Sequence, residues 1–355
     1  MKKLAIIGCG GIGGYHLGHF LQFTDIVELA GFCDLIPERA EAFQAKAGTG
    51  KAYTDYRVML DEVKPDMVFV CIPPYCHGQI EFDLIERGIH FFVEKPLALE
   101  LDLARKIRDA AEAKGLITAS GFQCRYSNLV EPNKQFVANN QIIMIECSRI
   151  GGVPDQPWWR HKDLSGGQAA EQTIHQFDII RYMIGDPEEV FSFANRGYIS
   201  DEEWPGYDTD DLSTTVVKFK NGILATISTG CYATSGNSFD SKITFSTRDK
   251  RAELKILDTF KMYGEKPAEP EEGKDGFVIK GDGALSASGD AIVYRQDGDA
   301  GILCHLRRRL QDPLSLRGRV QVRQLHPRLQ RIHGDRQAGE GGARIRRRLS
   351  THTTA

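Results

Sequence analysis

The feature that most constrains the fold is a glycine-rich turn near the amino terminus. The sequence GCGGIG supplies Gly8, Gly10 and Gly13 in the spacing G-x-G-x-x-G, directly after the apolar run LAII. The next segment, IGGYHLGHFLQF, is expected to form a helix, and a second apolar run, VELAGFCD, ends in Asp34. A strand, a glycine turn, a helix and an acidic residue after the second strand together form the fingerprint of a dinucleotide-binding unit.

Each part of this fingerprint has its own expected role. Gly8 permits the tight turn, Gly10 lets the backbone approach a pyrophosphate, and Gly13 allows close packing of helix on strand. Asp34 would accept hydrogen bonds from ribose hydroxyls and repel a 2′-phosphate, so NAD is expected as the cofactor and NADP is less favoured. Free N–H groups at the start of the helix would bind phosphate oxygens. The expected cofactor contacts of the turn are Gly8, Gly10, Gly11, Ile12 and Gly13.

The first part of the chain alternates between short apolar runs and amphipathic helical stretches. DMVFVCIPP and IHFFVEKP are nearly continuous apolar segments, which is typical of parallel strands that are covered on both faces. LDLARKIRDAAEAKG has the spacing of an amphipathic helix that ends at a glycine. This alternation predicts an α/β Rossmann domain, a doubly wound parallel sheet, over residues 1–124.

The pattern changes beyond residue 124. QIIMIECSRI, TTVVKFKNGILATISTGC and SKITFSTRDKRAELKIL are expected to form strands of a mostly antiparallel sheet. The dipeptide Asn221-Gly222 between apolar runs is a strong signal for a β-hairpin. One helix, EQTIHQFDIIRYMIG, is expected between these strands. We therefore predict an α+β carboxyl-terminal domain over residues 125–304, which would bind the substrate and hold subunits together.

Composition excludes several classes of protein. The chain has 355 residues, of which 41% are hydrophobic and 26% charged, as in soluble globular proteins. No apolar run is long enough to cross a bilayer, and glycines interrupt the first apolar run too early for a secretory signal, so a cytoplasmic location is expected. The 8 cysteines include no C-x-x-C pair, and we expect reduced thiols and no metal site.

A second chemical motif follows the apolar run IHFFV. There, Glu94, Lys95 and Pro96 stand at the expected end of a strand. Ligands of doubly wound sheets bind outside the carboxyl ends of the strands, so Lys95 is well placed for chemistry. The alternative is an ordinary surface lysine.

Three blocks together resemble one family of oxidoreductases. AIIGCGGIG, CIPPYCHGQIEFDLIERGIHFFVEKPLA and SGGQAAEQTIHQFDIIRYMIG are similar, in the same order, to blocks of the glucose–fructose oxidoreductase / inositol dehydrogenase family, Gfo/Idh/MocA. The resemblance extends from residue 1 to about residue 303. It implies an NAD(P)-dependent dehydrogenase that transfers hydride between nicotinamide and a secondary hydroxyl of a sugar, cyclitol or related polyol. A non-catalytic dinucleotide-sensing regulator with the same fold is the alternative.

The resemblance also implies catalytic roles. Lys95 would contact the nicotinamide and the reacting hydroxyl, and its charge would stabilise the developing alkoxide. His175 would take the proton of the hydroxyl. Four residues before this histidine the family often has Asp, whereas this chain has Glu171. On a continuous helix that spacing would place Glu171 on the same face as His175, where it would orient or charge the imidazole.

Two further groups of side chains are expected around the ligands. The resemblance implies cofactor contacts at Ile72, Pro73, His77, Glu94, Lys95 and Arg125. It implies substrate contacts at Lys95, Gln123, Trp159, Arg160, Gln172, Thr173 and His175. For the tryptophan, a sugar-stacking wall and buried anchoring of a loop are equal alternatives. Asp178 and Arg181 are expected to pack the helix rather than to take part in catalysis.

The last segment, residues 305–355, has a different composition. It holds thirteen Arg, no Lys, two Asp and one Glu. Such a segment can be an arm that binds nucleic acid. We favour a change of reading frame after about Cys304, because codons shifted by one nucleotide permit sequences like the family's carboxyl-terminal block. We therefore expect a poorly ordered tail, no nucleic-acid partner and no membrane partner. The resemblance further implies a homo-oligomer, a dimer or tetramer.

Overall fold

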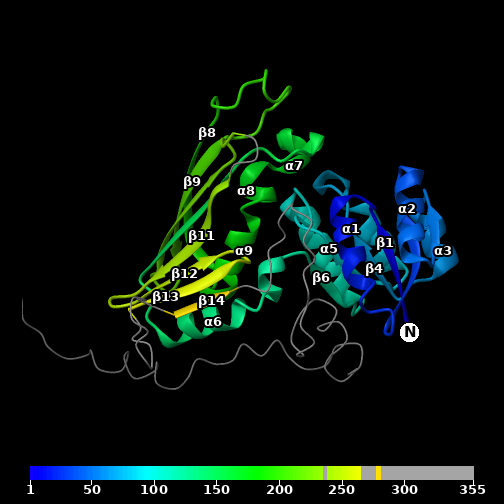
Figure 1. The fold of residues 1–355 in the computed structure, drawn as a ribbon, viewed down its shortest axis with the longest axis horizontal. Helices are drawn as coiled ribbons and strands as arrows, with labels where there is room; N and C mark the ends of the chain where they lie inside the picture. The colour runs from blue at the N-terminus through cyan, green and yellow to red at the C-terminus, as the bar shows by residue number, and fades with distance from the viewer. Residues whose placement is uncertain (235–237, 265–276, 281–355) are drawn as a thin grey trace, which may run out of the picture. The chain divides into compact units, whose positions relative to one another are not determined.

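The computed structural model describes residues 1–234, 238–264 and 277–280 (Figure 1). These residues form two sheets with their covering helices. The Arg-rich segment 305–355 and the predicted change of reading frame lie outside the described residues. Within the described ranges, no helix is long and apolar enough to cross a membrane.

The first sheet has six parallel strands in the order β3-β2-β1-β4-β5-β6. Its strands are β1 (Lys2–Ile7), β2 (Val27–Cys33), β3 (Lys51–Tyr53), β4 (Met67–Val70), β5 (His90–Val93) and β6 (Thr118–Ser120). This is the strand order of a Rossmann domain, as the sequence predicts. All four residues of β4 are buried, because helices cover both faces of the sheet.

Helices connect the parallel strands in sequence. They are α1 (Gly11–Phe20), α2 (Pro37–Ala47), α3 (Tyr56–Val63), α4 (Gln79–Glu86) and α5 (Leu101–Ala113), with the short turn η1 (Pro74–Cys76) before α4. Pro37 occupies the first turn of α2, where its missing N–H costs nothing. The Asp55 side chain caps α3 by accepting a hydrogen bond of 2.8 Å from the backbone N–H of Arg57.

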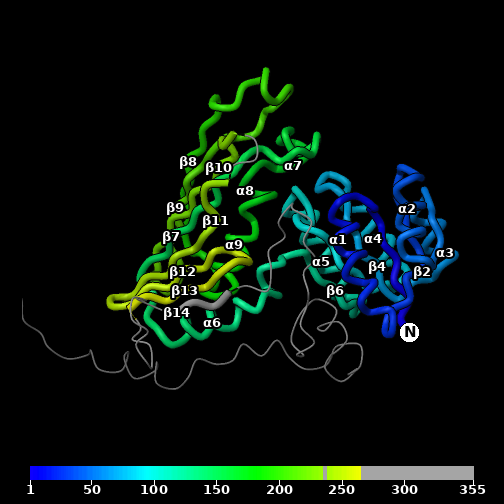
Figure 2. Tube along the Cα trace, viewed as in Figure 1, coloured from blue at the N-terminus to red at the C-terminus, as the bar shows by residue number. Residues whose placement is uncertain are grey.

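The second sheet has eight strands in the order β14-β13-β12-β11-β7-β10-β9-β8. They are β7 (Met144–Gly151), β8 (Pro187–Asn195), β9 (Leu212–Phe219), β10 (Leu224–Gly230), β11 (Ser238–Ser246), β12 (Arg251–Lys255), β13 (Thr259–Tyr263) and β14 (Phe277–Lys280). Asn221 and Gly222 form the predicted hairpin between β9 and β10. Figure 2 shows β7 lying among strands that come much later in the chain, and its pair with β10 is parallel. The sheet is therefore mostly antiparallel, as expected.

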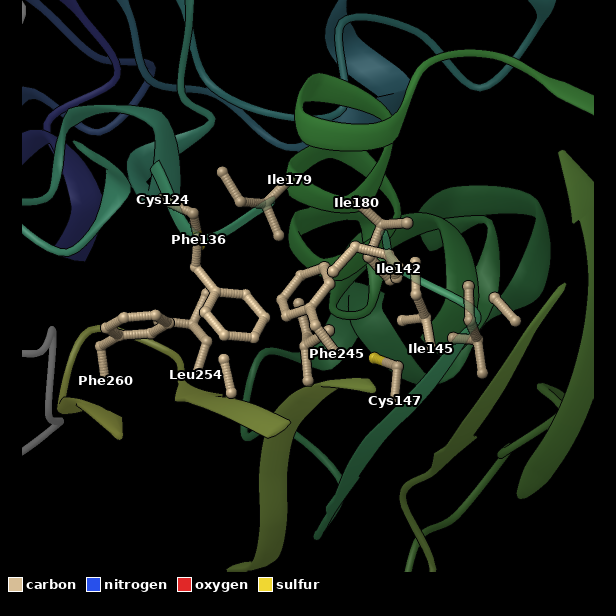
Figure 3. Packing of buried hydrophobic residues seen from close by; sticks show 14 of the residues in the cluster. Cys124, Phe136, Ile142, Ile145, Cys147, Ile179, Ile180, Phe245, Leu254 and Phe260 are labelled. Carbon is tan, nitrogen blue, oxygen red and sulfur yellow. The ribbon is translucent and has the colours of Figure 1, made fainter. Parts of the chain in front are cut away.

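Helices cover one face of this second sheet. They are α6 (Val130–Asn139), α7 (Lys162–Ser165), α8 (Gly167–Glu171) and α9 (Ile174–Ile184), with the turns η2 (Gln123–Tyr126) and η3 (Pro157–Arg160). Figure 3 shows the core between helices and sheet, where Ile179 and Ile180 of α9 lie above Ile145 and Phe245. The boundary near residue 124 stays a prediction; the last parallel strand ends at Ser120 and β7 begins at Met144.

One helix differs from its prediction. The sequence predicts a continuous helix from Glu171, but α8 ends at Glu171 and α9 begins at Ile174. The backbone N–H groups of Gln172 and Thr173 both donate to the carbonyl of Gln168, at 3.0 Å each. This wider turn interrupts the helical ladder and separates the two predicted catalytic residues of the segment.

Candidate active site

The glycine turn links β1 to α1, and its glycines are needed for different reasons. Gly8 has a φ of +94°, and a Cβ there would lie 2.2 Å from the carbonyl oxygen of Cys71. A Cβ on Gly13 would lie 2.1 Å from the carbonyl oxygen of Gly8. By contrast, a Cβ on Gly10 would meet nothing within 4 Å, so the space in front of the helix is open. The turn is therefore closely packed at Gly8 and Gly13 and open at Gly10, which suits a bound pyrophosphate.

The first turn of α1 adds binding capacity for phosphate. The N-cap residue of α1 is Gly10, which has no side chain to accept a hydrogen bond from the first N–H groups of the helix. Unused N–H groups and the positive end of the helix dipole favour a phosphate at this position. The described residues of the turn therefore fit the phosphates of NAD.

Asp34 follows β2 and is held beside the glycine turn. Its Oδ2 accepts a hydrogen bond of 2.8 Å from the backbone N–H of Cys9, and its Oδ1 accepts one of 2.9 Å from that of Ile36. These bonds fix the carboxylate and leave lone pairs for further donors. An anionic group here accepts from ribose hydroxyls and repels an added phosphate, which favours NAD over NADP.

Lys95 lies just beyond the carboxyl end of β5 and reaches the second domain. Its Nζ donates a hydrogen bond of 2.9 Å to the backbone oxygen of Glu171 and forms an ion pair with that residue's carboxylate. The two side chains are only 14% and 7% exposed. Because a charged pair is held away from most of the solvent, its interaction is less screened than at the surface.

Glu171 is held by three donors, and His175 is not one of them. Its Oε2 accepts from Trp159 Nε1 at 2.9 Å and from Gln172 Nε2 at 2.6 Å, while Oε1 faces Lys95. The expectation that Glu171 orients the imidazole of His175 is therefore wrong for this structure. The interrupted helix is the reason, because the i, i+4 relation holds only within a continuous helix.

His175 lies in the first turn of α9, close to two cations. Burial, together with the charges of Lys95 and Arg149, lowers the pKa of His175 to about 3. Its Nδ1 is buried and has no hydrogen-bond partner among the described residues. The imidazole is therefore neutral at neutral pH, as a proton acceptor must be.

Two of the predicted substrate contacts are buried instead. Trp159 is 0% exposed, so it offers no face for a sugar; it anchors its loop and donates to Glu171. Thr173 is also 0% exposed, and its hydroxyl bonds that of Thr229. Their prediction as direct substrate contacts is corrected, since side chains without accessible surface act by supporting others. Arg160 is half-buried, and its Nη1 donates 3.2 Å to the carbonyl of Pro205.

The predicted cofactor residues that follow β4 contact other residues of the chain. His77 is 0% exposed at its side chain, and its Nδ1 lies 2.6 Å from Glu81 Oε1. It therefore fixes the turn after β4 rather than presenting its ring to a ligand, which corrects its predicted role. Ile72 packs beside Gly8, and Pro73 precedes η1.

Glu94 has a partner that the sequence analysis missed. Its Oε1 lies 2.7 Å from Nε2 of His16, which belongs to α1. Both side chains are 10% exposed. The bond links the helix after the glycine turn to the segment after β5 that carries Lys95. The only signal in the sequence was an unexplained histidine among the apolar residues of the first helix.

The remaining predicted residues lie in or near the turn η2, which connects the last parallel strand to the second domain. Arg125 Nε donates 2.7 Å to Oδ2 of Asp178, and the guanidinium lies over the rings of Phe122 and Tyr182. Its charge is thus already paired within the chain. Gln123 is half-buried next to it. Arg181 pairs with Asp186, and both side chains are largely exposed.

The strand order and the glycine turn are those of a dinucleotide-binding Rossmann domain. Residues 2–122 match the model of an oxidoreductase family with an NAD-binding Rossmann fold, and residues 140–255 match the GFO/IDH/MocA carboxyl-terminal domain. The chain belongs to the Gfo/Idh/MocA family, and it is an NAD-dependent dehydrogenase.

Individual relatives and structures agree with this family. The chain is 31% identical over 244 residues to myo-inositol 2-dehydrogenase of Thermotoga maritima, covering 68% of this chain and 71% of the relative. It is 27% identical to D-glucoside 3-dehydrogenase of Escherichia coli, covering 62% and 67%. Levoglucosan dehydrogenase in complex with NADH has a similar fold, with a TM-score of 0.67 over 79% of this chain and 80% of that one, at 18% identity.

Proposed function

We propose that this protein oxidises a secondary hydroxyl of a sugar, cyclitol or related polyol with NAD, or catalyses the reverse reduction. The observation that carries the proposal is the buried ion pair of Lys95 with Glu171, formed at the carboxyl edge of the parallel sheet next to a neutral His175. The relatives named for inositol and glucoside dehydrogenation support this class of substrate.

The side chains have distinct parts in this proposal. The Lys95 ammonium donates to the reacting oxygen and stabilises negative charge as it develops there. Neutral His175 accepts the proton of the hydroxyl. Glu171 holds Lys95 in place and is itself fixed by Trp159 and Gln172. When bound, NAD supplies the hydride acceptor, and the glycine turn and Asp34 would hold it.

Several site assignments remain part of the proposal. For the cofactor they are the glycine turn, Asp34, Ile72 and Pro73, with Glu94 toward the nicotinamide ribose. For the substrate they are Lys95, Gln123, Arg160, Gln172 and His175. Arg125 is retained as a neighbour of the cofactor through η2, where its ion pair with Asp178 would order the crossing segment.

The test is NAD reduction with a panel of neutral polyols and sugar acids, followed by the absorbance of NADH. We expect turnover with at least one compound and a loss of about 10³-fold or more in kcat for Lys95→Met, with NAD still bound. The regulator alternative predicts NAD binding without turnover of any compound. Equal activity of the Lys95→Met variant would contradict the assigned role of the lysine.

We further propose that the protein is a homo-oligomer, a dimer or tetramer, assembled through the open face of the second sheet. Phe191 and Phe193 of β8 are 61% and 73% exposed, and their rings contact each other at 4.8 Å between centroids. Strand register places Phe191 opposite Val216, which is 46% exposed on the same face. Such a patch on a regular sheet suits a second copy of itself, because a two-fold axis pairs identical surfaces.

A further inference from the structure

The inner face of the second sheet changes from apolar to polar close to the candidate active site. In β7 the side chains of Ile145 and Cys147 point into the core beneath α9 (Figure 3). Because side chains alternate along a strand, Arg149 lies on this same inner face. The register aligns three successive rows across β10, β7 and β11: Ala225, Ile145 and Phe245; Ile227, Cys147 and Ile243; and Thr229, Arg149 and Ser241.

The third of these rows, here called the polar row, faces helical residues near the catalytic groups. Thr229 bonds Thr173, and Ser241 accepts a hydrogen bond of 3.4 Å from Gln176. Arg149 Nη2 donates 3.2 Å to Oε1 of Gln172. Every position of the polar row therefore meets the segment that runs from the end of α8 into α9, which includes His175.

Arg149 has more donors than the described residues satisfy. A guanidinium offers five N–H donors, whereas the acceptor that it contacts in the described part of the chain is a single amide oxygen of Gln172. Burial lowers the pKa of Arg149, and the nearby Glu171 carboxylate opposes that effect. The unpaired Arg149 nitrogens are not among the fully buried polar atoms of the described residues, so acceptor oxygens of a ligand can reach them.

The charges of the cluster point to the sign of that ligand. Lys95 and Arg149 are both cationic and lie close enough to His175 to lower its pKa. Among the described residues, the carboxylate that meets this cluster is that of Glu171, which is already paired with Lys95. One carboxylate for two cations leaves the charge of Arg149 without its own counterion.

We propose that Arg149 determines substrate specificity by binding a carboxylate of the substrate, so that the preferred substrate is an acidic polyol such as a uronic or aldonic acid. The inference rests on the proposed dehydrogenase function. A planar guanidinium matches a carboxylate with two parallel N–H···O bonds, which fixes both position and orientation. With its carboxylate on Arg149, such a substrate presents a ring or chain hydroxyl toward Lys95 and His175.

The experiment compares D-glucuronate with D-glucose, which differ only in the oxidation state of one carbon. We measure kcat/KM for both with the full-length protein, its Arg149→Met and Arg149→Lys variants, and Arg181→Met as a control for a surface arginine. We expect the protein to prefer glucuronate, and Arg149→Met to reduce that preference about 10- to 100-fold. Arg149→Lys should retain part of it, and Arg181→Met all of it.

The ratio of the two substrates separates recognition from a structural role. If Arg149 only supported the fold through Gln172, its loss would lower both activities together and leave their ratio unchanged, and the inference would be wrong. D-glucose 6-phosphate is the third probe: preference for it over glucuronate, lost in Arg149→Met, would replace carboxylate by phosphate and overturn the stated class.

The failure of this inference differs from the failure of the proposed function. Turnover of neutral compounds with no preference for the acid, unchanged in Arg149→Met, refutes the specificity role and leaves the dehydrogenase intact. Binding of NAD without turnover of any probe refutes the dehydrogenase itself, and the inference with it. A thermal-shift measurement with NADH verifies that each variant is folded and binds cofactor before the rates are compared.

Discussion

At the scale of single residues, Glu171 acts on Lys95 and has no direct hydrogen bond to His175 among the described contacts. The longer side chain, compared with Asp, extends toward Lys95, while Trp159 and Gln172 occupy its second oxygen. The carboxylate therefore fixes the lysine, and the charge that acts on His175 comes from cations. Glu171 and His175 are therefore coupled through Lys95 rather than by a direct hydrogen bond.

Replacing Glu171 tests this coupling. In Glu171→Gln, Lys95 loses its ion-pair partner and the orientation that goes with it. We expect kcat to fall about 10- to 100-fold with little change in KM for NAD, because the glycine turn is untouched. Steady-state kinetics of both substrates measure this, with the exposed Glu131→Gln on α6 as the control. A rise in KM for NAD without loss of kcat would contradict the assigned contact.

His175 makes a prediction about stability and pH. Its pKa is lowered from 6.5 to about 3 in the folded protein. The unfolded chain therefore binds a proton below about pH 6.5 that the folded chain rejects until about pH 3, so stability is lost as the pH falls through this window. At about pH 5 the loss from this group is about 2 kcal/mol.

A variant without a titrating group at this position should be spared that loss. We expect the Tm of His175→Gln to fall less steeply than that of the unmodified protein between about pH 7 and pH 4. Thermal unfolding across this range measures the difference. Parallel curves for the two proteins would show that the imidazole is not held neutral by its surroundings.

At the scale of helices and strands, local patterns predicted most of what lies within one element. The apolar runs fixed β4 and β5, Pro37 marked the start of α2, and Asn221-Gly222 marked a hairpin. The break between α8 and α9 was not predictable, because neither Gln172 nor Thr173 is a glycine or proline, the residues that usually interrupt a helix. Both residues at the break bond partners distant in sequence: Thr173 bonds Thr229, and Gln172 accepts from Arg149.

At this scale, two glycines of α1, Gly13 and Gly18, are predicted to respond differently to substitution by alanine. A Cβ on Gly13 would lie 2.1 Å from the Gly8 oxygen, so Gly13→Ala must shift α1 away from β1. A Cβ on Gly18, also in α1, would meet nothing within 4 Å. We expect Gly13→Ala to lose about 1–3 kcal/mol and most NAD affinity, whereas Gly18→Ala gains about 0.5–1 kcal/mol.

Denaturant unfolding and NADH titration measure these two effects. Helix propensity favours alanine at both positions equally, so any difference between the variants isolates the close approach of helix and strand. If both variants bound NADH with unchanged affinity, the turn would not need the contact at Gly13.

At the scale of the whole molecule, the sequence predicted two sheets of different type but not the order of strands in the second. β7 pairs with β10 in parallel and with β11 in antiparallel fashion, although both come much later in the chain. Only this long-range pairing aligns Arg149 with Thr229 and Ser241. The candidate site could therefore be predicted where motifs are local, at the glycine turn and Lys95, and not where residues meet through sheet order.

Assembly is the last property argued at this scale. The open face of the second sheet presents Phe191, Phe193 and Val216, all of which are exposed in the described part of the chain. We expect the double variant Phe191→Glu, Phe193→Glu to shift the protein toward a monomer, because like charges would meet across the two-fold axis. Sedimentation velocity measures the shift, and Val58→Glu, an exposed apolar position on α3, is the matched control. If the double variant kept the mass of the unmodified protein, subunits would have to meet through another surface.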